Sequence, residues 1–117
     1  MKARTGDVVL VELPSASGGP AKLRPVVVLA ALPGAFQQYL VAGISTRTFG
    51  LVPGWDDWID PRQPRYAAMG LNAASGVRLS YLEGIVEGRV KARIGRCEKP
   101  DVVEYRNRLG GLLANPL

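Results

Sequence analysis

Lys22-Leu23-Arg24-Pro25-Val26-Val27-Val28-Leu29 is the stretch of this sequence that decides the fold. Its unbroken apolar run predicts a strand that is buried on both faces, because a half-exposed strand would alternate apolar with polar residues. Pro25 suits the beginning of such a strand, where no ladder hydrogen bond is asked of it. Arg24 is thereby held at the beginning of a rigid strand, which is a good position for a functional cation.

Outward from this stretch, the chain consists of short apolar runs separated by Gly and Pro, a pattern that favours a small β-barrel or sandwich. The segment from Pro14 to Ala21 is rich in small, turn-forming residues and predicts a mobile loop. Residues 61–68 contain two prolines and are expected to form an excursion between strands. Strands are expected at 6–13, 24–31, 38–44, 55–60 (at an edge), 77–80 and 85–94, the last as a strand or a hairpin turning at 87–88.

One helix is expected, from Pro100 to about Leu113. Proline suits the first helical turn, and Asp101 complements the positive end of the helix dipole there. Gly110-Gly111 disfavours the helix, so fraying or an end is expected at that point. Apolar residues at helical spacing predict one buried stripe, made of Val102, Tyr105, Leu109, Leu112 and Leu113.

Length and composition predict one domain covering residues 1–117, since a chain of this size can form a core without metals or disulfides. The hydrophobic fraction of 47% and the charged fraction of 21% are those of a globular protein. No stretch approaches the length of a membrane span, and no signal peptide is expected. Cys97 is alone and cannot form an intrachain disulfide, which agrees with a cytoplasmic location.

The net charge of +5 and the pI near 9.8 come mainly from arginine. The planar guanidinium group suits phosphate and carboxylate, so the composition favours a nucleic acid or an acidic protein as partner. A mildly basic surface without such a partner is an equally simple interpretation of the charge alone.

The absence of histidine excludes a Ser-His-Asp triad and the usual zinc sites. The chain also lacks the glycine-rich motifs of nucleotide-binding folds, so no cofactor is expected. Asp56, Asp57 and Asp60 lie in an extended stretch where adjacent side chains point to opposite faces, so a solvated acidic edge is favoured over a metal site.

The remaining chemistry is binding or cleavage of a phosphodiester with arginine and hydroxyl groups. RNA carries its own nucleophile, the 2′-OH, so a protein needs only to align it and to stabilise the charge that develops at phosphorus. Arg24 and the hydroxyl pair Ser45-Thr46 are the candidates. From the sequence alone, the favoured explanation of Arg24 is a surface arginine bonded to loop carbonyls, and that of Ser45-Thr46 is a turn that satisfies its own backbone.

Taken in order, several segments resemble the MazF/PemK family of toxin endoribonucleases. A Gly-Asp strand is followed by a flexible loop, an Arg-Pro strand, a strand ending in hydroxyl residues, a segment leading into a central strand, and an ending before a C-terminal helix. In this chain these motifs are Gly6-Asp7-Val8-Val9-Leu10-Val11, Pro14 to Ala21, Arg24-Pro25-Val26-Val27-Val28-Leu29, Ile44-Ser45-Thr46, Gly70 to Leu79 and Ile94-Gly95-Arg96.

The resemblance implies an SH3-like β-barrel with a terminal helix, a homodimer, and metal-independent cleavage of single-stranded RNA in the cytoplasm. It implies 2′,3′-cyclic phosphate and 5′-hydroxyl products. It also implies an antitoxin partner whose acidic tail wraps the toxin, and a loop, Pro14 to Ala21, that orders over RNA or is displaced by the antitoxin.

By motif match, Arg24 corresponds to the family's catalytic arginine, and Ser45 falls where many members have a catalytic threonine, with Thr46 beside it. Arg78 matches a position that some members use near the scissile phosphate. Those members have an aspartate two residues further on, where this chain has Ser80, and some relatives use a histidine that this chain lacks. The acid/base partner of Arg24 therefore stays open. Substrate binding is expected from Arg78, Ser80, Lys22 and Arg47.

Two alternatives remain from the sequence. One is a catalytically silent relative that binds RNA or an antitoxin without cutting. The other is a DNA gyrase poison of the CcdB group, which shares the barrel. That group ends its helix in Trp-Gly-Ile, whereas this chain has Leu113-Ala114-Asn115-Pro116-Leu117 at the corresponding place.

Overall fold

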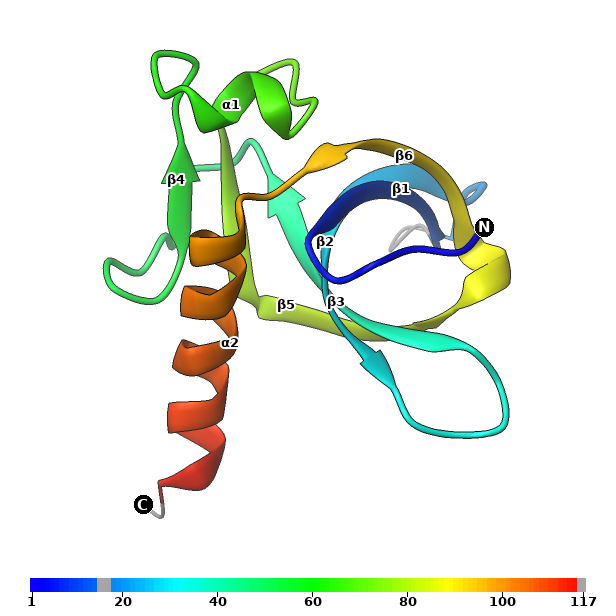
Figure 1. The fold of residues 1–117 in the computed structure, drawn as a ribbon. Helices are drawn as coiled ribbons and strands as arrows, with labels where there is room; N and C mark the ends of the chain where they lie inside the picture. Colours follow the sequence, from blue (N-terminus) through cyan, green and yellow to red (C-terminus); the bar gives the residue numbers. More distant parts are fainter. Residues whose placement is uncertain (15–17, 116–117) are drawn as a thin grey trace.

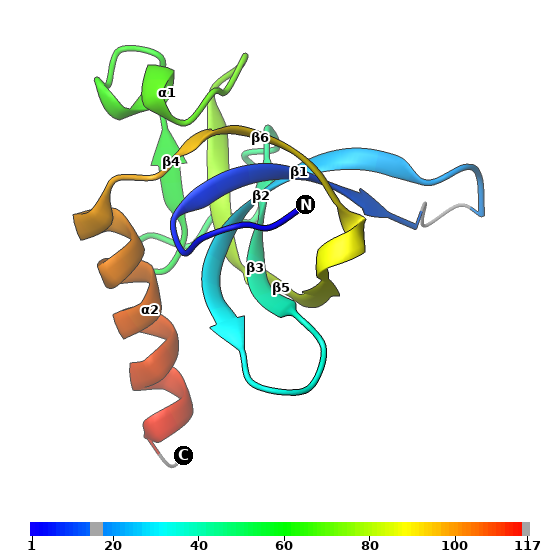
Figure 2. The same cartoon turned by 45° about the vertical axis from the view of Figure 1, so that its right-hand side comes forward.

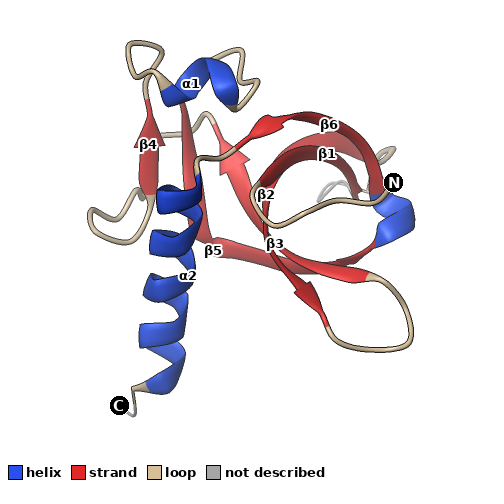
Figure 3. Ribbon diagram, viewed as in Figure 1, coloured by secondary structure: helices blue, strands red, loops and turns tan. Residues whose placement is uncertain are grey.

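A computed structural model describes residues 1–14 and 18–115 of the chain. The strands are β1 (Asp7–Leu13), β2 (Lys22–Leu32), β3 (Gln38–Ser45), β4 (Asp57–Ile59), β5 (Ser75–Val86) and β6 (Val90–Arg96). The helices are α1 (Arg65–Ala68), the 3₁₀ turn η1 (Glu87–Arg89) and α2 (Lys99–Ala114). Figure 3 shows the strands forming the body of the molecule, with α2 along one side.

All six strands belong to one antiparallel sheet in the order β4-β5-β3-β2-β1-β6. The sheet curls strongly, so that β6 arches over β1 and the long β5 runs beneath β3 (Figure 1). Among the described residues no ladder joins β4 to β6, so the expected small barrel is a curled sheet that is not closed. The prediction of a mainly β, barrel-like fold with a C-terminal helix is confirmed.

Residues 26–29 of β2 are buried on both faces, as predicted, because the curled sheet has two cores. Side chains alternate between the faces of a strand. Val27 and Leu29 enter a core that the helix α2 completes, here called the outer core. Val26 and Val28 enter a second core inside the curl, here called the inner core. Each apolar residue from 26 to 29 therefore faces one of the two cores.

Helix α2 is longer than expected and runs through Gly110-Gly111 without ending. Val102, Tyr105 and Leu109 of the predicted stripe are buried. The prediction is wrong for Leu112 and Leu113, which are 58% and 81% exposed. The last turn of α2 extends beyond the ends of the strands (Figure 2), in agreement with the exposure of these two leucines.

Several strand boundaries also differ from the prediction. Residues 77–80 belong to the longer strand β5, which continues to Val86, and the stretch 85–94 is divided by η1 between β5 and β6. Edge strand β4 is confirmed but shorter, and the expected excursion holds the single-turn helix α1. In the described part of the chain, no helix has the length and apolar character needed to cross a membrane.

Candidate functional site

The strand pairing brings Arg24 and Ser45 to the same end of the inner core. Val26 pairs with Gly43 across β2 and β3. Arg24 lies two residues before Val26, and Ser45 lies two residues after Gly43, so both continue the face that carries the inner core. The Arg-Pro strand and the strand ending in hydroxyls are therefore neighbours in the sheet, and their motifs meet at one mouth of the curl.

Two clefts meet at this mouth. The first, here called the Glu83 cleft, has a volume of about 520 Å³ and is lined at its polar positions by Arg24, Ser45, Arg47, Tyr81 and Glu83. The second, here called the Asn72 cleft, measures about 430 Å³ and is lined at its polar positions by Arg24, Ser45, Thr46, Arg47, Asn72 and Ser75. Since Arg24, Ser45 and Arg47 line both, they lie where an extended ligand would pass from one cleft into the other.

The shared wall of the two clefts is cationic. Arg24 and Arg47 are exposed, and within residues 1–14 and 18–115 neither forms an ion pair. The hydroxyl of Ser45 accepts a hydrogen bond of 3.2 Å from the backbone N–H of Arg47, which fixes the turn after β3. Two guanidinium groups beside two hydroxyls provide charge and hydrogen-bond donors suited to a phosphate group.

Arg78 supports this turn from behind and lines neither cleft. It is 3% exposed, and its Nη2 donates hydrogen bonds of 2.6 and 2.7 Å to the carbonyl oxygens of Arg47 and Phe49. Its Nη1 lies 3.8 Å from the carboxylate of Asp56, and its guanidinium carbon lies 5.5 Å from the centre of the Tyr81 ring. The geometry of Arg78 is therefore that of a clamp on the backbone of residues 47–49.

Two further candidates from the sequence lie outside the clefts. Lys22 is exposed at the start of β2 and lines neither of them. Ser80 accepts a hydrogen bond of 2.9 Å from the indole N–H of Trp55, on the other face of β5 from Tyr81. Of the loop from Pro14 to Ala21, residues 15–17 lie outside the described part of the chain, so the expectation of mobility is not addressed there.

A bulge in β5 brings an aromatic side chain to the site. Ala42 pairs with Leu82, but the next residue, Gly43, pairs with Arg78, so residues 79–81 have no partner in β3. The inserted residues place the Tyr81 Cβ only 3.1 Å from where a side chain on Gly43 would begin. Tyr81 is 54% exposed in the Glu83 cleft, whereas Trp55 and Tyr66 pack against the outer core.

Glu83 is the residue of the site that the sequence did not indicate. It follows the bulge, pairs with Val41 and lies two residues before the buried Ile85, which places it on the same face as Arg24. Nothing in the local sequence around Glu83 differs from an ordinary solvent-exposed strand. Only the long-range pairing of β3 with β5 brings this carboxylate into the cleft with Arg24 and Ser45.

The acidic pair Asp56-Asp57 is bonded to other groups of the protein. Asp56 accepts hydrogen bonds from the backbone N–H groups of Val52 and Leu79, at 2.9 and 3.0 Å. Asp57 accepts from Arg65 and from the Tyr105 hydroxyl, tying α1 and α2 to the edge of the sheet. The prediction of a solvated edge is wrong for these two residues, since the side chains of Asp56 and Asp57 are only 4% and 20% exposed.

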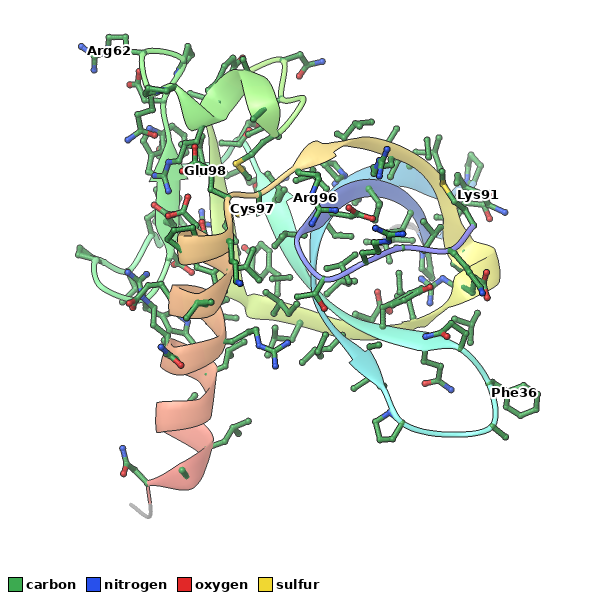
Figure 4. All side chains as sticks on the ribbon, viewed as in Figure 1. Phe36, Arg62, Lys91, Arg96, Cys97 and Glu98 are labelled. Carbon is green, nitrogen blue, oxygen red and sulfur yellow. The ribbon has the colours of Figure 1, made fainter. Side chains whose placement is uncertain are left out.

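A larger cavity of about 620 Å³ lies where β6 leads into α2, beside Arg96, Cys97 and Glu98 (Figure 4). The guanidinium of Arg96 is occupied by the carboxylate of Asp7 and the carbonyl oxygen of Thr5. Cys97 is buried and its thiol is protonated, because burial raises its pKa to about 12. The cavity is mostly apolar, and none of the candidate catalytic or substrate-binding residues lines it, so volume alone does not make it the functional site.

Comparison with known proteins gives structural matches only. No protein-family model matches the chain, and no curated protein matches it. Among solved structures, the Mycobacterium tuberculosis toxin MazF-mt6 has a TM-score of 0.66 at 21% identity, covering 95% of this chain and 99% of that one. An endoribonuclease in complex with its cognate antitoxin, from a mycobacterial species, has a TM-score of 0.65 at 11% identity and covers 99% of both chains. The chain therefore has the fold of MazF toxins over nearly its whole length, as the resemblance implied.

Proposed function

We propose that this protein is the toxin of a type II toxin-antitoxin system and cleaves single-stranded RNA. The observation that carries the proposal is the convergence of Arg24, Ser45, Thr46 and Arg47 where two clefts meet, in the fold of MazF toxins. An RNA strand lying across both clefts would place one phosphate beside Arg24 and Ser45, with a neighbouring nucleotide in each cleft.

The proposed reaction uses the nucleophile of the RNA itself. The 2′-oxygen attacks the adjacent phosphorus, the bond from phosphorus to the 5′-oxygen breaks, and a 2′,3′-cyclic phosphate and a 5′-hydroxyl result. Arg24 would stabilise the charge that develops on the phosphoryl oxygens, and Ser45 and Thr46 would donate hydrogen bonds to them. These roles need no metal ion, so we propose metal-independent cleavage of mRNA by a single toxin domain in the cytoplasm.

The proposed partners follow from charge and from the structural neighbours. The net charge of +5 suits both RNA and an acidic antitoxin. One neighbour was solved as an endoribonuclease with its cognate antitoxin. We propose that this chain forms a homodimer and is inhibited by an acidic antitoxin segment that competes with RNA for the cationic mouth.

The test compares the wild-type protein with Arg24→Ala on a mixed-sequence single-stranded RNA in EDTA. Wild type should produce new 5′-hydroxyl ends, and the variant should lose at least about 100-fold in rate, because removing one preorganised charge donor typically costs that much. Arg62→Ala is the matched control, since Arg62 is an exposed arginine that lines neither cleft (Figure 4). Equal cleavage by wild type and Arg24→Ala would contradict the site, and no cleavage by wild type would contradict the function.

A further inference from the structure

Cleavage by the 2′-hydroxyl needs a group that accepts its proton, and this chain offers few. It has no histidine. The guanidinium of arginine does not lose its proton in proteins, so neither Arg24 nor Arg47 can serve. The hydroxyls of Ser45 and Thr46 are weak acceptors of a proton. A carboxylate is the remaining side chain that is both ionised and basic at neutral pH.

Only one carboxylate lines either cleft among the described residues, and it belongs to Glu83. Its side chain is 44% exposed, so an RNA strand in the cleft can reach it. It stands on the same face of the sheet as Arg24 and Ser45, but on β5, across β3 from the strand that carries Arg24. The 2′-hydroxyl of a nucleotide in the Glu83 cleft would thus have a carboxylate on one side and the cationic mouth on the other.

Arg89 lies beside the Glu83 carboxylate without a direct hydrogen bond to it. Nη2 of Arg89, in η1, lies 3.7 Å from the Glu83 carboxylate. Arg89 is itself fixed by two hydrogen bonds, of 3.0 and 2.8 Å, to the carbonyl oxygen of Glu12 in β1. The other charged or titratable groups facing this cleft are Arg24, Arg47 and Tyr81.

We propose that Glu83 is the general base of the reaction, an inference that rests on the RNA cleavage proposed above. The Glu83 carboxylate accepts the proton of the 2′-hydroxyl while the 2′-oxygen forms its bond to phosphorus. The bond to the 5′-oxygen breaks, and that oxygen takes a proton from water, which enters this open cleft. Glu83 returns its proton to solvent before the next turnover. Glu83 thereby supplies the acid/base partner of Arg24 that the sequence motifs leave open.

The experiment measures single-turnover cleavage of single-stranded RNA in EDTA from about pH 4.5 to about pH 8, where carboxylates change from partly protonated to ionised. The wild-type rate should fall towards acidic pH, because a protonated carboxylic acid cannot accept the proton of the 2′-hydroxyl. Glu83→Gln should be slower by about 100- to 10,000-fold near neutral pH and should lose that fall. Glu83→Asp should recover part of the rate and the acidic fall, because it restores the carboxylate.

A binding assay separates this role from a structural one. Glu83→Gln should bind RNA as tightly as wild type or more tightly, since a negative charge facing phosphate is removed, while its cleavage collapses. Glu104→Gln is the matched control, because Glu104 is also an exposed glutamate paired with an arginine, but on α2. Wild type that cuts, with Glu83→Gln cutting equally or with an unchanged pH profile, would overturn the role of Glu83 alone. Wild type that cuts nothing would overturn the proposed function as well.

Discussion

At the scale of single residues, Arg78 is a buried cation that holds the backbone of a turn in place. One nitrogen of its guanidinium holds two carbonyl oxygens of the turn that carries Arg47. Its charge is balanced by Asp56, whose carboxylate also holds two backbone N–H groups. A residue that only contacted substrate would not need this degree of burial, so we expect Arg78 to matter for stability as well as for cleavage.

Replacing Arg78 by Met tests that expectation. The substitution keeps much of the volume but leaves the buried Asp56 without its cation, so the free energy of unfolding should fall by about 3 kcal/mol. Cleavage should fall too, because the turn with Thr46 and Arg47 loses its anchors. Urea unfolding and RNA cleavage, measured on the same preparation, check both. Unchanged stability with lost cleavage would instead favour a direct contact between Arg78 and substrate.

The raised pKa values of Cys97 and Tyr105 predict how the free energy of unfolding depends on pH. Burial raises the pKa of the Cys97 thiol from its ordinary value of 9.0 to about 12. Burial, together with the hydrogen bond to Asp57, also raises the pKa of Tyr105. The unfolded chain therefore loses these protons at lower pH than the folded protein does. Their stabilisation is complete below about pH 9 and is lost as the pH rises towards 12.

The free energy of unfolding in urea should accordingly be lower at about pH 10.5 than at about pH 8. Cys97→Ala should reduce this difference, because one of the two buried acids is then absent. The same decline in the variant as in wild type would show that Cys97 makes no contribution, and a flat profile in wild type would contradict the expectation for both groups.

At the scale of secondary-structure elements, one close contact joins the end of α1 to β6. A Cβ on Gly70 would lie 1.9 Å from the carbonyl oxygen of Ile94, and Gly70 has a φ of +71°. Both facts require glycine there, since the clash is with backbone and the conformation is left-handed. This contact positions the start of the segment that contains Asn72, at the wall of the Asn72 cleft.

Gly70→Ala should therefore lower the free energy of unfolding by more than about 1 kcal/mol. The matched control is Gly110→Ala in α2, where the added methyl group meets nothing within 4 Å. That substitution should raise stability by about 0.5 to 1 kcal/mol, because alanine favours the helix. Urea unfolding of both variants checks the pair, and destabilisation by Gly110→Ala would contradict the view that α2 is unobstructed there.

The elements differ in how far the sequence determined them. The segments β1, β2, β3 and α2 follow from local patterns, since the strands carry short apolar runs and the helix carries apolar residues at helical spacing. Strand β5 was not predicted as one element, because the bulge at residues 79–81 breaks its alternation and is specified by pairing with β3. Leu112 and Leu113 fit the helical stripe, but no sequence pattern reveals that the fold leaves them exposed.

The residues of the candidate site also divide into those that the local sequence indicates and those that only long-range contacts reveal. Arg24 and Ser45 stand out because each ends or begins a strongly patterned strand, and the structure places them in the same two clefts. Glu83 and the clamp formed by Arg78 could not be found in this way. Both depend on contacts between β5 and segments more than 25 residues earlier in the chain.

At the scale of the whole molecule, the net charge of +5 and the cationic mouth predict binding of RNA that weakens with salt. For single strands, the logarithm of the binding constant should fall with the logarithm of salt concentration by about 0.7 per phosphate contact. Arg47→Ala should reduce this slope by about 0.7 if Arg47 makes one such contact. Fluorescence anisotropy with a labelled RNA measures both slopes, and an unchanged slope would place Arg47 away from the RNA backbone.

The central claim is that Arg24 and Ser45 promote attack of the RNA's own 2′-hydroxyl on the adjacent phosphorus. The most direct measurement first maps a cleavage site of wild-type protein on a single-stranded RNA in EDTA, and then replaces the one ribose on the 5′ side of that site by deoxyribose. We predict that cleavage at that site is lost while binding is kept, and that a deoxyribose elsewhere in the strand has no such effect. Continued cleavage at the deoxyribose, or dependence on a metal ion, would contradict the account.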